Sequence, residues 1–145
     1  MGIRAGRRRL SVLGAEFGEC DSFIDDGAGR VLSRTDTAGL TLTNTYDAAG
    51  RLSSAVTKTP ANAVVSSYGY SYDSASNVTG YSQTLPTVSG QANPDSGTWA
   101  YTYNQREELA TAKLGSNPTL TYTYYDSGDR QTVQVGAGTP TTTTY

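Results

Sequence analysis

Hydrophobic and polar side chains alternate along several stretches of this chain. In residues 40–46, leucine, asparagine and tyrosine occupy the even-numbered positions and threonine every odd-numbered one. Residues 98–103 and 119–124 repeat this division, with tryptophan, leucine or tyrosine on one side and mainly threonine on the other. Successive side chains of a strand point to opposite faces of its sheet. The pattern therefore predicts β-strands with one aromatic and aliphatic face and one hydroxyl-rich face.

Short Asp-x-x-Gly sequences separate these alternating stretches. An aspartate carboxylate accepts a backbone N–H two residues on, and glycine adopts the positive φ that closes such a turn. Asp36–Gly39 and Asp47–Gly50 are therefore predicted hairpin connections, each a type I turn followed by a glycine bulge. The predicted strands of this meander are residues 30–35, 40–46 and 51–58. Loops rich in glycine and proline are predicted at residues 89–97, 115–118 and 136–140.

Strand and turn belong to one phrase that recurs five times. Its clearest copy runs from Tyr46 to Leu52 (Tyr-Asp-Ala-Ala-Gly-Arg-Leu), and the other copies begin at residues 23, 70, 101 and 122. Aromatic side chains of the phrase share a face of the incoming strand, aspartate opens the turn, and glycine closes it. The residues that receive a structural role in this way are Asp26, Gly29, Arg30, Tyr46, Asp47, Gly50, Arg51, Leu52, Tyr70, Tyr72, Asp73, Tyr101, Tyr103, Tyr122, Tyr124, Asp126 and Gly128.

Three copies depart from the phrase. Ser76 and Glu107 stand where a turn glycine is expected, and Asn104 stands in place of the aspartate. Turns of altered geometry are therefore expected in the third and fourth copies. In the fifth copy, Asp126 and Gly128 are separated by one residue instead of two, and Asp126 is assigned as the turn aspartate.

Composition supports an extended β-structure. The formal charge is only −2, so self-repulsion is weak, and the 11 tyrosines and many threonines favour strands. A chain of 145 residues is long enough for one domain. Residues 1–20 do not match the phrase and are expected to form a poorly ordered tail, whereas residues 21–145 form the repeat region. The predicted fold class is all-β, an antiparallel meander of repeated hairpins with roughly eight to twelve strands.

The sequence offers little for catalysis or for metal binding. It contains no histidine, and Cys20 is its only cysteine, which excludes an internal disulfide and sites built on several histidines or cysteines. The adjacent acids Asp25 and Asp26, like Glu107 and Glu108, point to opposite faces of a strand and do not converge. No catalytic, cofactor or metal residues are therefore assigned, and the chain is predicted not to be an enzyme.

Neither nucleic acid nor insertion into a membrane is expected. The repeat region is mildly acidic, and no apolar run approaches the roughly 20 residues that span a bilayer. Near the start, Arg4 and Arg7–Arg9 precede an apolar stretch that Glu16 and Glu19 end too early for an export signal. Asn77-Val78-Thr79 is a formal glycosylation sequon.

The copies of the phrase resemble the YD repeat of the RHS family, whose pattern is close to Tyr-x-Tyr-Asp-x-x-Gly-Arg-Leu. That family includes bacterial Rhs proteins, wall-associated bacterial proteins, shell components of insecticidal toxin complexes and animal teneurins. The resemblance covers roughly residues 23–145 and is specific because the phrase repeats. It implies an open segment of a β-shell, with no cofactor, in a larger protein that is secreted or held in the cell envelope.

The resemblance also implies partners. The remaining repeats and a C-terminal toxin or effector of the same polypeptide or locus would be the cargo side of such a shell. Tyr145, after Thr141–Thr144, has the form of a sixth copy cut short, so the chain is expected to be a fragment. The alternative function is a carbohydrate-binding or adhesive surface module, in which Trp99, Tyr101 and Tyr103 stack on glycans.

Overall fold

The structure is a computed structural model, and it describes residues 5–6, 20–138 and 141–142. Every regular element in these residues is a strand, which agrees with the predicted fold class. The strands are β1 (Ala5–Gly6), β2 (Cys20–Asp25), β3 (Val31–Asp36), β4 (Thr41–Tyr46), β5 (Leu52–Lys58), β6 (Val64–Tyr72), β7 (Val78–Thr84), β8 (Gly97–Tyr103), β9 (Leu109–Leu114), β10 (Leu120–Tyr124), β11 (Arg130–Val135) and β12 (Thr141–Thr142).

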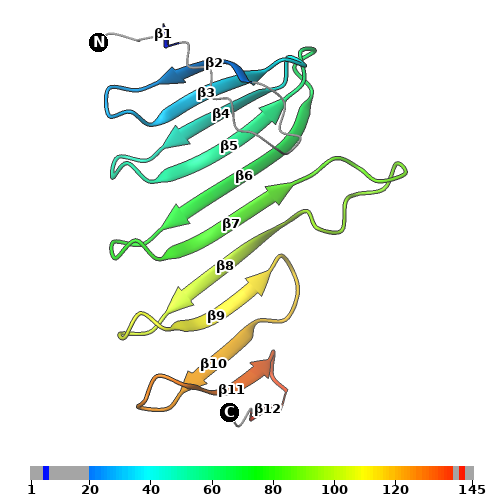
Figure 1. Ribbon diagram of the computed structural model, residues 1–145. Coiled ribbons are helices and arrows are strands. Elements are labelled where there is room, and N and C mark those ends of the chain that lie inside the picture. Colours follow the sequence, from blue (N-terminus) through cyan, green and yellow to red (C-terminus); the bar gives the residue numbers. More distant parts are fainter. Residues whose placement is uncertain (1–4, 7–19, 139–140, 143–145) are drawn as a thin grey trace, which may run out of the picture. The chain divides into compact units, whose positions relative to one another are not determined.

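The chain forms two compact units. The first contains the residues up to Gly69 together with Thr84–Asn93, and the second contains Tyr70–Gln83 and the residues from Pro94 onward. Within each unit, strands that follow one another in the chain lie side by side and run antiparallel (Figure 1). The predicted antiparallel meander of hairpins is therefore confirmed. The predicted strands at residues 30–35, 40–46 and 51–58 are β3, β4 and β5.

The two faces of the strands differ as the alternation predicts. In β4, the side chains of Leu42 and Tyr46 are half-buried, whereas those of Thr43 and Thr45 are exposed. The same division holds in β8, where the tyrosines and the tryptophan are half-buried and the residues between them are exposed. Hydroxyl groups pair across neighbouring strands on the polar face, as in the contact of 2.7 Å between Thr102 and Thr111.

No hydrophobic side chain of the described residues is fully buried. Among the described residues, each unit is a single layer of sheet, and its aromatic face packs against neighbours in the same layer. Ladder hydrogen bonds, cross-strand side-chain contacts and turns therefore hold the described strands together, in place of a dry core. The turns and the aromatic face are therefore the most distinctive features of the described strands.

The predicted loops lie between strands, with one addition. The connection of β7 to β8 contains a small hairpin of its own, in which Val88 and Gln91 exchange two backbone hydrogen bonds. Ser89 and Gly90 form its tip with positive φ values of 52° and 77°. In the predicted N-terminal tail, Ala5 and Gly6 pair with β2 as strand β1, and Cys20 begins β2. The rest of the tail and Tyr145 lie outside the residues that the structure describes.

Candidate functional site

The repeated turn is the best-defined site of the chain, and its first copy shows the geometry. The backbone N–H of Gly29 donates to the carbonyl of Asp26 at 3.0 Å, and the N–H of Asp26 donates to the carbonyl of Arg30 at 2.9 Å. Gly29 has a φ of 78°, which glycine adopts without strain. The ladder between β2 and β3 shifts register beside this turn, at Asp25. These are the features of the predicted type I turn with a glycine bulge.

The two carboxylate oxygens of the turn aspartate have different partners. Oδ1 of Asp26 accepts the backbone N–H groups of Ala28 at 2.8 Å and Arg30 at 3.0 Å. Oδ2 accepts Nε of Arg30 at 2.6 Å. In the second copy, Asp47 makes the same three bonds to Ala49 and Arg51, at 2.9, 2.9 and 2.7 Å.

These bonds favour the ionised form of both carboxyl groups. The backbone N–H of Arg30 lowers the pKa of Asp26 most, and the side chain of Arg30 and the N–H of Ala28 lower it further. The pKa of Asp47 is lowered in the same way, first by the backbone N–H of Arg51. Desolvation opposes the shift in both cases without cancelling it. The charged carboxylate is therefore part of the folded turn.

The third and fourth copies keep this turn without a glycine. The N–H of Ser76 donates to the carbonyl of Asp73 at 3.2 Å, and that of Glu107 donates to the carbonyl of Asn104 at 3.0 Å. Ser76 and Glu107 take φ values of 73° and 62°. Oδ1 of Asn104 accepts two backbone N–H groups as the aspartates do. The expectation of altered turns is therefore wrong, because the same hydrogen bonds hold both residues in a left-handed conformation that costs about 1–2 kcal/mol.

The fifth turn is shifted by one residue from its predicted frame. The N–H of Gly128 donates to the carbonyl of Tyr125 at 2.9 Å, and the N–H of Tyr125 donates to that of Asp129 at 2.9 Å. Tyr125 thus occupies the aspartate position, and Asp126 follows it with a fully exposed side chain. The assignment of Asp126 as the turn aspartate is wrong because the left-handed glycine, Gly128 with a φ of 92°, must stand three residues after the first residue.

Sequence reasoning missed one turn of this type at the opposite ends of the strands. The N–H of Asn62 donates to the carbonyl of Thr59 at 2.9 Å, and Oγ1 of Thr59 accepts the N–H of Ala63 at 3.2 Å. Asn62 takes the left-handed position with a φ of 68°. Threonine and asparagine replace aspartate and glycine here, since threonine also accepts local N–H groups and asparagine tolerates positive φ.

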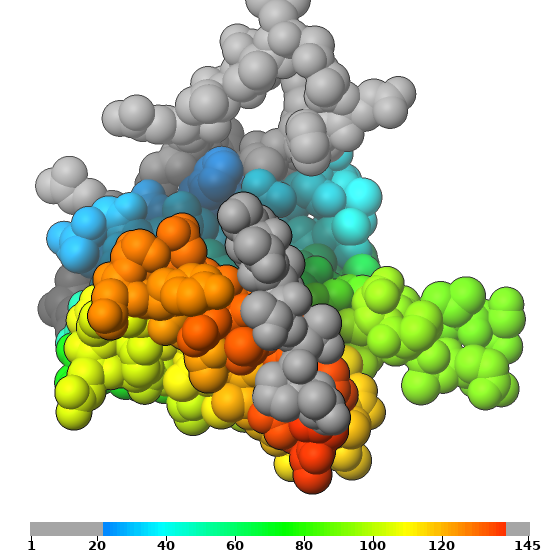
Figure 2. All heavy atoms as spheres, turned by 90° about the horizontal axis from the view of Figure 1, so that it is seen from below, coloured from blue at the N-terminus to red at the C-terminus, as the bar shows by residue number. Residues whose placement is uncertain are grey.

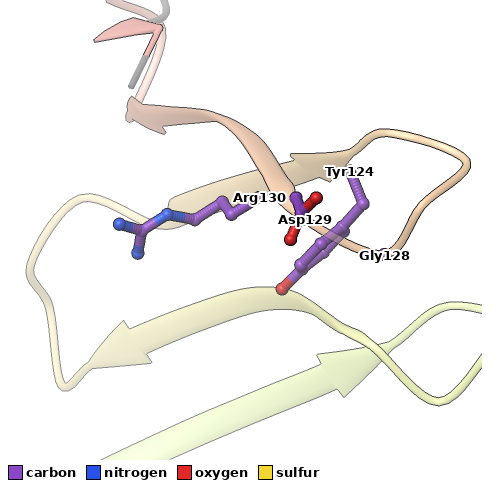
Figure 3. A pocket seen from close by; sticks show the side chains of 4 residues that line it. All are labelled: Tyr124, Gly128, Asp129 and Arg130. Carbon is purple, nitrogen blue, oxygen red and sulfur yellow. The ribbon is translucent and has the colours of Figure 1, made fainter. Parts of the chain in front are cut away.

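Tyrosine hydroxyl groups join three of the hairpins to the hairpin before them. The hydroxyl of Tyr46 donates to the carbonyl of Val31 at 3.0 Å, which joins the second copy of the phrase to the first. Tyr103 donates in the same way to Val78 at 2.8 Å. Tyr124 donates to Leu109 at 2.8 Å, and Figure 3 shows its ring directed toward the neighbouring strand. We call these three bonds the tyrosine latches.

The tyrosine latches lie where the ladders between hairpins end. The last paired residues of β3 and β4 are Ser33 and Thr43, and Val31 lies two residues beyond Ser33. The other two accepting carbonyls also lie two residues beyond the last pair of their ladders. A hydroxyl group therefore satisfies a carbonyl that the diverging strands leave without a ladder partner.

Arginine side chains add further contacts between successive turns. The guanidinium of Arg30 lies over the ring of Tyr46, 4.6 Å from its centroid, and approaches the backbone of Gly50. In the second unit, Arg106 donates to the carbonyl oxygens of Tyr125 at 3.1 Å and Asp126 at 3.3 Å. The turn of residues 125–128 is otherwise open to solvent (orange in Figure 2).

A row of three aromatic rings crosses strands β6, β7 and β8 in the second unit. The ring centroids of Tyr70 and Tyr81 are 5.4 Å apart, and those of Tyr81 and Trp99 are 5.1 Å apart. We call these three residues the aromatic row. Both distances lie within the usual range for aromatic pairs, and the rings are tilted by 42° and 38°. Gly97 lies beneath the indole, since an added Cβ there would lie 3.4 Å from Trp99 and 2.7 Å from Leu114.

The residues predicted to stack on glycans share the half-buried face of β8 but make different contacts. Trp99 joins the aromatic row, whereas Tyr103 makes a tyrosine latch. Tyr101 lies between them on β8, and burial raises the pKa of its hydroxyl, with a smaller effect of Tyr103 and Tyr122. Of the remaining predicted residues, Leu52 begins β5 opposite Tyr46, and Tyr72 ends β6 half-buried.

The described residues bring together no set of side chains suited to metal binding. No group of three or more acidic, histidine or cysteine residues converges among them.

A shallow depression at the fifth turn is lined by Tyr124, Gly128, Asp129 and Arg130 (Figure 3). The amide of Asn77, the acceptor of the sequon, donates to Asp73 within its turn at 3.2 Å. The described residues include no helix that is long and apolar enough to cross a bilayer.

Comparison with known proteins supports the repeat. The family model described as RHS Repeat matches residues 26–64, which include the first two turns. The resemblance to this family is therefore confirmed for that segment. Among curated proteins, none matches the chain.

Two solved structures of toxin complexes share the fold. A Tc holotoxin pore of Photorhabdus luminescens matches with a TM-score of 0.65 and 20% identity, over 79% of this chain and 6% of that chain. A crystal structure of TcdB2-TccC3-Cdc42 matches with a TM-score of 0.68 and 20% identity, over 87% of this chain and 7% of that one. The chain thus spans only a small part of the proteins that it resembles.

Proposed function

We propose that this chain is a non-enzymatic structural segment of a larger RHS-type protein, in which its strands form part of the wall of a β-shell around a C-terminal toxin or effector. The observation that carries the proposal is the recurrence of one turn and one tyrosine latch from hairpin to hairpin. Such a device extends a sheet by the addition of similar hairpins, and in the described residues it leaves one aromatic face without a covering layer.

The comparisons support a structural role of this kind. The family match covers the turns of the first two copies of the phrase, and the solved toxin complexes share the fold. A wall segment in that setting would have the remaining repeats and the enclosed polypeptide as partners, and it would act outside the cytoplasm or in the cell envelope. No metal, cofactor or nucleic acid enters this function.

Protection of the enclosed polypeptide tests the proposal. The complete gene product would be digested with a protease, and the survival of the polypeptide that follows the repeats would be measured by mass spectrometry. We expect that polypeptide to survive longer next to intact repeats than when it is produced alone. A triple variant, Tyr46→Phe, Tyr103→Phe and Tyr124→Phe, should shorten its survival because the latches between hairpins are lost. Equal rates of digestion with and without the repeats would refute the shell function.

The aromatic row favours a second candidate function, the binding of carbohydrate. Sugar rings stack on the faces of aromatic side chains, and the three half-buried rings of the row keep part of their surface open. A glycan array probed with the chain and with Trp99→Ala separates the two functions. Binding that depends on Trp99 supports the surface module, and a blank array with both proteins removes it.

A further inference from the structure

In the repeat region, the side chains that an oxidant attacks most readily are aromatic. Residues 21–145 contain no cysteine, methionine or histidine, whereas they hold all 11 tyrosines and the one tryptophan of the chain. Thiols and thioethers are the usual first targets of oxidation in proteins. Where they are missing, a one-electron oxidant removes electrons from phenol and indole groups. The consequences of oxidation are therefore decided by how the aromatic residues lie.

The aromatic row places these groups in contact. Trp99 touches Tyr81, and Tyr81 touches Tyr70 on the next strand, at centroid distances of 5.1 and 5.4 Å. All three side chains are half-buried, so a small oxidant reaches them from solvent. A neutral indole radical oxidises a phenol, and an electron hole that starts on Trp99 therefore moves to Tyr81.

We propose that Tyr70 and Tyr81 are a site of oxidative cross-linking, at which a peroxide and a peroxidase join the two rings as dityrosine. The bond would connect β6 to β7 across the turn that starts at Asp73. This modification is independent of the function proposed above. It adds a covalent joint to a sheet that otherwise has hydrogen bonds and side-chain contacts.

The reaction balances with hydrogen peroxide as the oxidant. Each tyrosine loses one electron and its phenolic proton, and peroxide takes up both electrons and both protons to give two molecules of water. The two radicals form a carbon–carbon bond between the ring positions next to the hydroxyl groups. The hydrogen atoms on these two carbons then shift to the oxygens, which restores both phenols. The product has lost two hydrogen atoms in total.

The location of the cross-link is testable because aspartates divide the chain conveniently. A protease that cleaves before aspartate yields a peptide of residues 47–72 and another of residues 73–94. Tyr81 is the only tyrosine of the second peptide, whereas the first contains Tyr68, Tyr70 and Tyr72. The full chain would be treated with peroxidase and hydrogen peroxide at low protein concentration, digested, and examined by mass spectrometry and by dityrosine fluorescence.

We expect a product in which these two peptides are joined with the loss of two hydrogen atoms, in a yield that does not depend on protein concentration. Tyr70→Phe and Tyr81→Phe should each abolish it, and the matched control Tyr72→Phe on the same face of β6 should retain it. Trp99→Phe should slow its formation without preventing it, because the aromatic contact remains and the indole is gone. Circular dichroism of each variant establishes that it is folded.

Three results would overturn the proposal. The first is dityrosine that forms without joining residues 47–72 to residues 73–94. The second is a joined product that persists in Tyr70→Phe, which would assign the bond to another tyrosine of β6. The third is a yield that rises with protein concentration or survives in denaturant, since the reaction would then not depend on the fold.

Discussion

The hydroxyl of Tyr46 donates a hydrogen bond of 3.0 Å to the backbone carbonyl of Val31, and this bond joins two successive hairpins of the meander. It lies at the turn end of both strands, where the ladder between β3 and β4 has stopped. The same relationship recurs twice in the second unit, so the tyrosine of the repeated phrase has a definite mechanical task. Its contribution to stability can be measured there with Trp99 as the reporter.

Removal of one latch hydroxyl should weaken the second unit. Tyr124→Phe deletes the donor to Leu109 and leaves that carbonyl without its partner, so we expect a loss of about 0.5–1.5 kcal/mol in the free energy of unfolding. Urea denaturation followed by the fluorescence of Trp99 measures the change. The control is Tyr101→Phe, whose hydroxyl has no hydrogen-bond partner among the described residues and which should change stability by less than about 0.5 kcal/mol. Equal losses in both variants would show that the latch contributes nothing specific.

Glycine should stabilise the turns that lack it. Ser76 and Glu107 hold φ values of 73° and 62°, which glycine adopts without a Cβ clash. We expect Ser76→Gly and Glu107→Gly each to raise the free energy of unfolding by about 0.5–1 kcal/mol, after the larger unfolded-state entropy of glycine is subtracted. The neighbouring Ala75→Gly, at a position without positive φ, should be neutral or destabilising in the same urea experiment. A loss of stability in Ser76→Gly and Glu107→Gly would contradict the strain at these positions.

Acid should loosen the first unit through its turn carboxylates. The pKa of Asp47 is lowered in the folded chain from 3.8, so the folded state is more stable when Asp47 is ionised than when it is protonated. The resulting stabilisation is fully present above pH 3.8 and is lost as the pH falls through the folded value. Amide hydrogen exchange at Ala49 and Arg51, whose N–H groups bind Oδ1 of Asp47, should show protection that falls in this window.

Two variants check that assignment. Asp47→Asn keeps an acceptor at Oδ1 and removes the charge, so protection of both amides should lose its dependence on pH in this range. In the fourth turn, Asn104→Asp should show the opposite sign. Its new carboxylate would face Oε2 of Glu108, which now accepts Nδ2 of Asn104 at 2.6 Å. That variant should be weakest at neutral pH and recover as the pH falls, and a response like that of wild-type Asp47 would count against the explanation.

A methyl group at Gly97 should disturb the aromatic row. An added Cβ would lie 2.7 Å from Leu114 and 3.4 Å from the indole, so Gly97→Ala forces one of these side chains to move. We expect a loss of about 1–3 kcal/mol and a shift in the emission of Trp99, since overpacking displaces its neighbours. Gly27→Ala, with open space around the new Cβ, should be tolerated. An unchanged emission spectrum would mean that the row does not depend on this glycine.

Much of the fold follows from local chemistry that the sequence displays. The alternation at residues 40–46 predicts which face of β4 is half-buried, and Asp47–Gly50 predicts the turn after it, because both features depend on neighbouring residues alone. The frame of the fifth turn failed for the opposite reason. Its aspartate attracted the assignment, whereas the distance to Gly128 fixes the turn, and Tyr125 occupies the first position.

The contacts between hairpins could not be predicted. The bond from Tyr124 to Leu109 depends on where two strands begin to diverge, which is a property of the paired sheet and not of either segment. The aromatic row has the same origin, since Tyr70, Tyr81 and Trp99 meet only through the register of three strands. The turn at Thr59–Asn62 left a weaker signal, a local acceptor followed by a residue that tolerates positive φ.

The acceptor in each tyrosine latch is a main-chain carbonyl, and every amino acid carries one. The residue that receives the bond is valine in two cases and leucine in the third, and its side chain takes no part in the bond. The latch itself therefore places no demand on the side chain of the residue that receives the bond. Recombination can therefore add, remove or exchange copies of the phrase without compensating mutations at the latch acceptor in the neighbouring copy. The number of repeats would then drift while each tyrosine latch stays intact.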